Sequence, residues 1–135
     1  TDERVINLAR TNLRYVTKEQ IPDELDFASV DVSFISLSHI LPVMQTLLKD
    51  GGSAVCLIKP QFEAGKENVG KKGVVRDRAV HIAVIEKIIE LIKQNNFSLL
   101  ALDFSPIKGP EGNIEYLCYI YQPIKRKGWC HVWFS

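Results

Sequence analysis

One lysine of this sequence stands where a buried strand would be expected to continue. Residues 53–58 read SAVCLI, a short apolar run typical of such a strand, and Lys59 and Pro60 follow directly. Pro60 has no N–H to donate and disfavours helical geometry at the preceding residue, so it ends strand pairing where the lysine leaves the sheet. The amine of Lys59 can then act as a general base, or it can extend to solvent as an ordinary ammonium.

General-base chemistry sets a condition on the surroundings of such a lysine. An ordinary lysine has a pKa of about 10.4 and is protonated at pH 7, so burial or a neighbouring cation must lower the pKa before the amine accepts a proton. Neighbouring carboxylates favour the charged form instead, and they orient the amine through hydrogen bonds. The sequence leaves the balance between these effects open.

Two carboxylates belong to other strand candidates. Asp31 lies near the end of the run at residues 27–32, and Glu115 lies near the start of the run at residues 114–121. Taken alone, Asp31 can cap the following helix and Glu115 can be a charged residue that protects a sheet edge. If the strands form an open parallel sheet, however, ligands bind beyond their carboxyl ends, where Asp31, Lys59 and Glu115 can converge.

The chain pattern predicts an α/β fold. Strand candidates at residues 5–8, 27–32, 53–58 and 97–104 alternate with polar or helical segments, which favours parallel strands joined by right-handed crossovers. The last strand, residues 114–121, follows without a helix and must run antiparallel to residues 97–104 if the two pair. A first helix is expected to run to about Lys49 and to end at Gly51-Gly52, and it tolerates Pro42 if this residue lies in the first turn.

A second helix is predicted from residue 79 to residue 96. Its apolar stripe comprises Val80, Val84, Ile85, Ile88, Ile89 and Ile92, and its polar face comprises His81, Glu86, Lys87, Glu90, Lys93 and Gln94. His39, His81 and His131 have no spacing that suggests a metal site, so we expect surface or packing roles and no metal.

Composition excludes several classes of protein. The 135 residues carry 17 basic and 16 acidic side chains, a formal charge of +1, so no overall field draws the chain to nucleic acid or an anionic membrane. No apolar run reaches the roughly 18 residues of a membrane span. Cys56, Cys118 and Cys130 match no zinc or redox spacing and read as buried thiols of a cytoplasmic protein.

A local basic surface is nevertheless predicted between the strand candidates at residues 53–58 and 97–104. Residues 66–78 form a polar, glycine-containing loop with the cations Lys66, Lys71, Lys72, Arg76 and Arg78. Phosphate contacts from such a loop would position RNA without reading its sequence. A solvated mobile loop explains the same composition equally well.

Three runs resemble one known family. DVSFISLSHILP, IKPQFEAGKENVGKKGVVRD and SPIKGPEGNIEY are similar to blocks of the TlyA, or hemolysin A, family of FtsJ-like RNA methyltransferases, and the likeness covers about residues 1–121. The resemblance implies a Rossmann-like methyltransferase fold, S-adenosylmethionine as cofactor, and methylation of ribose 2′-hydroxyl groups in ribosomal RNA. It also implies a Lys-Asp-Lys-Glu tetrad, to which Asp31, Lys59 and Glu115 correspond.

Parts of the family pattern have no counterpart in this sequence. The first lysine of the tetrad, the glycine-rich cofactor loop and an amino-terminal S4-type RNA-binding domain precede the matching segment in the family. The resemblance therefore implies that residues 1–122 are the carboxyl-terminal part of a methyltransferase domain, without its amino-terminal strands and cofactor loop. By resemblance, Asp31 is a cofactor contact; Asn12 is either an adenine contact or a turn residue.

Several further expectations follow from that implied organisation. A chain without the central strands should be inactive alone, and its exposed strand edges should favour self-association. Residues 123–135 remain an unassigned tail. The alternatives are a membrane-active hemolysin, which the helices with polar faces fit poorly, and a non-catalytic RNA-binding module that uses only the loop cations. The partner under the first hypothesis is ribosomal RNA or a ribosomal subunit, with no membrane.

Overall fold

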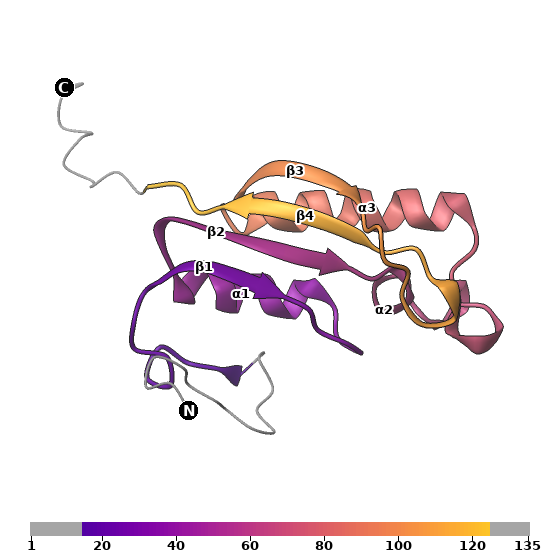
Figure 1. Ribbon diagram of the computed structural model, residues 1–135, viewed down its shortest axis with the longest axis horizontal. Coiled ribbons are helices and arrows are strands. Elements are labelled where there is room, and N and C mark those ends of the chain that lie inside the picture. The colour runs from indigo at the N-terminus through magenta and orange to yellow at the C-terminus, as the bar shows by residue number, and fades with distance from the viewer. Residues whose placement is uncertain (1–14, 125–135) are drawn as a thin grey trace.

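The computed structural model describes residues 15–124 (Figure 1). The predicted strand at residues 5–8, Asn12 and most of the tail lie outside this part of the chain. The strands are β1 (Leu25–Val30), β2 (Leu48–Ile58), β3 (Ser98–Phe104) and β4 (Tyr116–Tyr121), and the helices are α1 (Leu37–Leu47), α2 (Pro60–Glu63) and α3 (Arg78–Gln94). Short 3₁₀ turns cover Lys66–Asn68, Lys71–Gly73 and Pro110–Gly112.

The four strands form one sheet in the order β1-β2-β4-β3. β1 pairs with β2 in parallel, and β4 pairs antiparallel with both β2 and β3. β1, β2 and β3 therefore run in one direction, and only β4 among the described strands opposes them. This confirms the prediction of an α/β fold whose last strand is antiparallel. It also places the carboxyl ends of β1 and β2 beside the start of β4.

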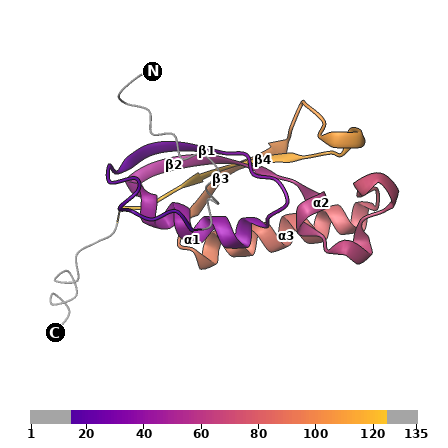
Figure 2. The same ribbon diagram turned by 90° about the horizontal axis from the view of Figure 1, so that it is seen from below.

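Both long helices lie on the same face of the sheet (Figure 2). Alternate residues of the strands point toward them, because successive side chains of a strand face opposite sides. The largest buried side chains include Leu37, Ile40 and Leu41 of α1, Ile88 and Ile92 of α3, and Ile58 and Ile120 of the sheet. Of the apolar stripe predicted for α3, Val84, Ile88 and Ile92 are buried in the core, and Val80 and Ile85 pack against it, as expected from their helical spacing.

The first helix ends before the predicted Gly51-Gly52, and it contains Pro42 beyond its first turn. Pro42 lies inside α1, five residues after the first residue Leu37, rather than in the first turn, and it removes one hydrogen bond of the helix. The helix ends at Leu47 because Leu48 adopts extended backbone angles (φ −77°, ψ 136°). Gly51 and Gly52 lie within β2. A Cβ at Gly52 would come within 3.0 Å of the Leu25 carbonyl oxygen, so the glycine permits close approach of β1.

His81 was predicted on the polar face of the second helix, and that prediction is wrong. It is 8% exposed, its Nδ1 lies 2.9 Å from the Tyr116 hydroxyl, and its Nε2 lies 2.8 Å from the Val75 carbonyl oxygen. The preceding loop folds back over the start of α3 through the buried Val74 and Val75, which covers a position that helical periodicity alone assigns to solvent.

Two of the three cysteines are buried free thiols, as predicted. Cys56 and Cys118 are cross-strand partners of β2 and β4, and both are fully buried. A hydrogen bond with Cys118 and burial both raise the pKa of Cys56 above its ordinary value. Cys130 lies outside the described residues. None of the helices within residues 15–124 is long and apolar enough to cross a membrane.

Candidate active site

The loops after β1 and β2 bring an amine and a carboxylate into contact. Asp31 follows β1 and Lys59 follows β2, and these strands are parallel neighbours. Lys59 Nζ forms an ion pair with Asp31 Oδ1 and lies 3.4 Å from the Ser33 hydroxyl oxygen. The Lys59 side chain is 11% exposed whereas that of Asp31 is 64% exposed. The amine is therefore held at the carboxyl edge of the sheet, with its carboxylate partner on the solvent side.

Pro60 ends β2 as the sequence suggested. Lys59 keeps extended backbone angles (φ −113°, ψ 98°), and Pro60 is the first residue of α2. A proline fits the first position of a helix because its missing N–H would have no helical partner there. Lys59 is thus the last extended residue before the turn, and the four residues of α2 follow at the same end of the sheet (Figure 1).

Glu115 also lies at this edge of the sheet. It directly precedes β4, which runs antiparallel to β2. The last residue pair between β2 and β4 is Ile58 with Tyr116, so continuing the antiparallel register by one residue sets Lys59 opposite Glu115. Glu115 is only 6% exposed, and its Oε2 accepts a hydrogen bond of 2.8 Å from Gln61 Nε2. Within residues 15–124 the Lys59 amine contacts Asp31 and Ser33, and the side-chain hydrogen bond of Glu115 is with Gln61. The structure therefore brings two of the three predicted residues into direct contact and the third to the same edge.

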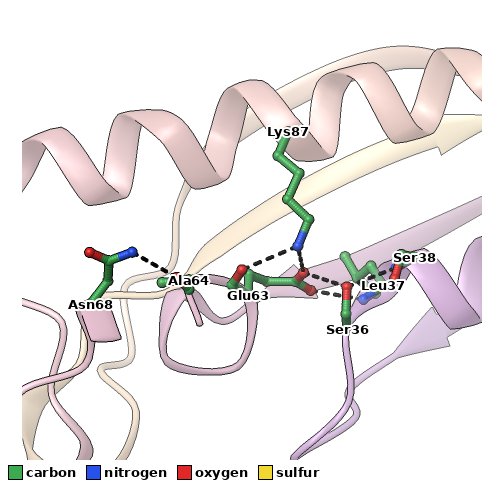
Figure 3. A network of polar contacts seen from close by, with 7 residues as sticks. All are labelled: Ser36, Leu37, Ser38, Glu63, Ala64, Asn68 and Lys87. Carbon is green, nitrogen blue, oxygen red and sulfur yellow. Dashed lines mark hydrogen bonds and ion pairs between the residues drawn. The ribbon is translucent and has the colours of Figure 1, made fainter. Parts of the chain in front are cut away.

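A buried carboxylate joins the two loops that carry Asp31 and Lys59. Glu63 accepts hydrogen bonds from the Ser36 hydroxyl (2.6 Å) and from the Leu37 backbone N–H (2.8 Å), at the start of α1. Lys87 reaches down from α3 to the same carboxylate at 3.1 Å (Figure 3). A negative charge at the N-terminus of α1 satisfies a free backbone donor and interacts favourably with the helix dipole. Glu63 thereby ties α2 to α1 and α3.

The basic loop is anchored to the segment just before β4, which contains Asn113 and Glu115. The side chain of Asn113 is 2% exposed; its Oδ1 accepts from the Val75 N–H at 3.1 Å, and its Nδ2 donates to the Gly73 carbonyl oxygen at 2.8 Å. Lys66, Lys71, Lys72, Arg76 and Arg78 are all exposed. The loop is thus anchored by its own valines and by Asn113, two residues before Glu115, while its cations face solvent.

Arg76 and Arg78 also line a hollow beside this anchor. Its volume is about 390 Å³, and Glu111, Ile114 and Tyr116 contribute to its wall. Burial raises the pKa of the Tyr116 phenol. Two guanidinium groups beside an aromatic ring suit contact with a nucleotide, because arginine binds phosphate oxygens through paired donors and aromatic rings stack on bases.

The residues that sequence reasoning missed are those that hold the candidate site in place. Gln61 gave no signal beyond following Pro60, and its Oε1 is buried without a hydrogen-bond partner in the described chain, at a typical cost of about 1–3 kcal/mol. Gly109 could be recognised only as a turn residue. A Cβ there would lie 2.1 Å from Glu115 Oε2, so the carboxylate occupies the space that a side chain would need.

The described residues offer a limited part of a cofactor site. Asp31 has its Oδ1 engaged by Lys59 and its side chain is exposed, and its role as a cofactor contact stays a prediction. Asn12 lies outside residues 15–124. No cluster of three or more His, Cys, Asp or Glu side chains within that range is arranged to hold a metal ion.

Comparison with known sequences identifies the family. The model of the FtsJ-like methyltransferase family matches residues 1–121, so the chain belongs to this family. It is 49% identical over 123 residues to "Putative rRNA methyltransferase YqxC" of Bacillus subtilis, covering 90% of this chain and 44% of that protein. It is 36% identical over 119 residues to "16S/23S rRNA (cytidine-2'-O)-methyltransferase TlyA" of Mycobacterium tuberculosis, covering 88% of this chain and 44% of that protein. The chain thus spans less than half the length of these relatives.

Solved structures agree with this assignment. The chain is similar to a "Putative hemolysin" from Streptococcus thermophilus, with a TM-score of 0.84 and 45% identity over 90% of this chain and 44% of that one. A more distant likeness is to a "putative S-adenosylmethionine dependent methyltransferase from Listeria monocytogenes", with a TM-score of 0.58 and 15% identity over 90% of this chain and 71% of that one. At that identity the likeness concerns the fold alone, which is that of methyltransferases.

Proposed function

We propose that residues 1–122 form the carboxyl-terminal part of the catalytic domain of an RNA methyltransferase. The whole protein would use S-adenosylmethionine to methylate ribose 2′-hydroxyl groups of ribosomal RNA in the cytoplasm, alone or within a ribosomal subunit. The observation that carries the proposal is the contact between Lys59 and Asp31 at the carboxyl edge of β1 and β2, with Glu115 at the same edge. The names of the two rRNA methyltransferase relatives support the choice of substrate.

The proposed chemistry assigns one task to each of these residues. The bound cofactor supplies an electrophilic methyl group. Lys59 would first release the proton of its ion-paired ammonium to solvent and, once neutral, would accept the proton of the ribose hydroxyl as that oxygen takes the methyl group from the sulfur of the cofactor. Asp31 orients the amine, which is why their direct contact matters. Glu115 is placed to accept a hydrogen bond from the hydroxyl or the amine.

The exposed cations of the anchored loop would hold the RNA. Lys66, Lys71, Lys72 and Arg76 face solvent, and phosphate contacts from such side chains position a nucleic acid without selecting its sequence. The anchor at Asn113 supports this role because it fixes the loop two residues from Glu115. A phosphate bound by the loop would thus lie near the proposed reaction site.

The decisive experiment compares the full-length protein with its Lys59→Ala variant. We expect the wild-type protein to transfer a labelled methyl group from S-adenosylmethionine to ribosomal RNA, and the variant to lose about 10²- to 10⁴-fold in rate, the usual contribution of a general base. The affinity for RNA should change little, because the lysine acts on the reacting atoms. A variant with full methyl transfer would contradict the proposal, and equal RNA binding without any methyl transfer by the wild type would favour a non-catalytic RNA-binding module.

The name of the Streptococcus thermophilus relative raises membrane activity as a second candidate. Leakage of a trapped dye from liposomes, measured with the purified full-length protein, separates the two functions. Release of dye at low protein concentration would favour the hemolysin.

The expectations that this chain alone is inactive and that it self-associates stay predictions. Titration of S-adenosylmethionine into the isolated chain and measurement of its mass in solution test them.

A further inference from the structure

Gln61 is a half-buried residue whose side-chain amide makes one hydrogen bond within residues 15–124. Its Nε2 donates to Glu115 Oε2 at 2.8 Å, and its Oε1 is buried without a partner within residues 15–124. The orientation of the amide follows from chemistry, because an ionised carboxylate only accepts hydrogen bonds and must therefore face the amide nitrogen. The unpaired oxygen is the consequence of that orientation.

An unpaired buried oxygen calls for an explanation, because buried polar atoms of native proteins nearly always have partners. Methionine has a similar shape to glutamine and would leave no polar atom unsatisfied at this position. The amide is therefore not explained by packing. What it supplies, and an apolar side chain cannot, is a neutral donor to Glu115.

Glu115 depends on this donor for its orientation. The Glu115 residue is 6% exposed, and the described part of the chain provides Gln61 as its side-chain hydrogen-bond partner and no ion-pair partner. The Glu115 carboxylate also occupies the space next to Gly109 that a side chain there would need, because a Cβ at position 109 would lie 2.1 Å from Glu115 Oε2. Oε2 is thus held between an amide and a glycine, and Oε1 remains able to accept a hydrogen bond.

We propose that Gln61 is a positioning residue for methyl transfer: it fixes Glu115 so that the second carboxylate oxygen faces the proton of the ribose hydroxyl or the Lys59 amine. This inference rests on the proposed function. The proposed function already assigns roles to Asp31, Lys59 and Glu115. Gln61 is a further, neutral residue that affects the reaction only through Glu115. Gln61 is well placed for this role, since it lies two residues after Lys59 in the first turn of α2.

The test exchanges the amide for a carboxylic acid of the same shape in the full-length protein. In a Gln61→Glu variant, two carboxyl groups lie at hydrogen-bond distance, and they stay together only while they share a proton. At low pH the protonated side chain donates to Glu115 as the amide does. As the pH rises and the proton leaves, repulsion displaces Glu115 and methyl transfer slows.

We expect the pH profiles of kcat for the wild type and for Gln61→Glu to diverge. Between about pH 6 and about pH 9, the ratio of the wild-type kcat to that of Gln61→Glu should grow about tenfold to a hundredfold, the usual effect of a misplacement near 1 Å. KM for RNA should stay within about twofold, because the loop cations are untouched. A Gln61→Met variant, which cannot donate at any pH, should show a reduced kcat at a constant ratio to the wild type.

Controls separate positioning from folding. Gln94→Glu adds the same charge at an exposed position at the end of α3 and should leave the profile unchanged. Circular dichroism of each variant across the pH range shows whether lost activity is lost structure. If the wild type methylates RNA and Gln61→Glu follows its pH profile while folded, the inference is wrong and the proposed function stands. If the wild type transfers no methyl group, the inference about Gln61 and the proposed function are both wrong.

Discussion

The Glu63 carboxylate offers a direct test of how the site is held together. Replacing Glu63 with Ala removes the acceptor of the Ser36 hydroxyl and of the Leu37 N–H, and it removes the ion-pair partner of Lys87. A hydrogen bond to a charged group contributes about 1.5–3 kcal/mol, and two such bonds at a site with 2% side-chain exposure give about 3–6 kcal/mol. Water reaches part of the vacated site and pairs with Ser36, so we expect a loss of about 2–4 kcal/mol in the free energy of unfolding.

The ion pair with Lys87 adds little to this loss of stability. The Lys87 side chain is 43% exposed, and pairs of that kind contribute about 0–1 kcal/mol because water screens them. The main loss therefore arises at the start of α1, where the first backbone donors have no helical partner. Methyl transfer should fall as well, because the loops that carry Asp31 and Lys59 are no longer tied together.

Urea unfolding of the full-length protein, followed by circular dichroism, measures the effect. The matched control is Glu90→Ala, which removes an exposed glutamate of α3 and should change stability by less than about 0.5 kcal/mol. If Glu63→Ala and Glu90→Ala unfold at the same urea concentration with equal slopes, the buried carboxylate does not stabilise the junction and the reasoning fails.

Three further predictions concern the proposed site and the core. Gly109→Ala should lower kcat by about tenfold or more with KM for RNA unchanged, because the new Cβ displaces Glu115; unaltered kinetics would show that the carboxylate is not confined there. Lys71→Ala should weaken RNA binding and reduce by about one the slope of log affinity against log salt concentration, and an unchanged slope would remove this lysine from the RNA contacts. Cys56 should resist iodoacetamide in the native protein at about pH 8, because its thiol is buried and its pKa is raised. It should react after denaturation. Mass spectrometry of the peptide that contains Cys56 shows whether the thiol has been labelled in each state.

The placement of Asp31 and Lys59 was accessible from sequence because it depends on rules of connection. A strand, a helix and a second strand form a right-handed parallel unit, and both strand ends then meet at one edge. The residues that end each apolar run can be read directly, so their neighbourhood follows without any knowledge of side-chain contacts. The catalytic roles of these residues stay predictions.

What sequence reasoning could not supply is the set of contacts between distant segments. Gln61 and Glu115 are 54 residues apart, and Asn113 and Val75 are 38 residues apart. His81 was misplaced for the same reason, since helical periodicity does not include a loop that folds back over the helix. These contacts depend on the path of the loops, which composition and spacing do not fix.

The sheet order β1-β2-β4-β3 has a consequence for synthesis on the ribosome. β3 is made before β4, yet in the described sheet its pairing partner is β4, which must enter between two strands already formed. The nascent chain therefore cannot complete this sheet until residue 121 has left the exit tunnel, and until then the edges of β2 and β3 are open to other chains. A ribosome that stalls shortly before that point would release a product prone to aggregation.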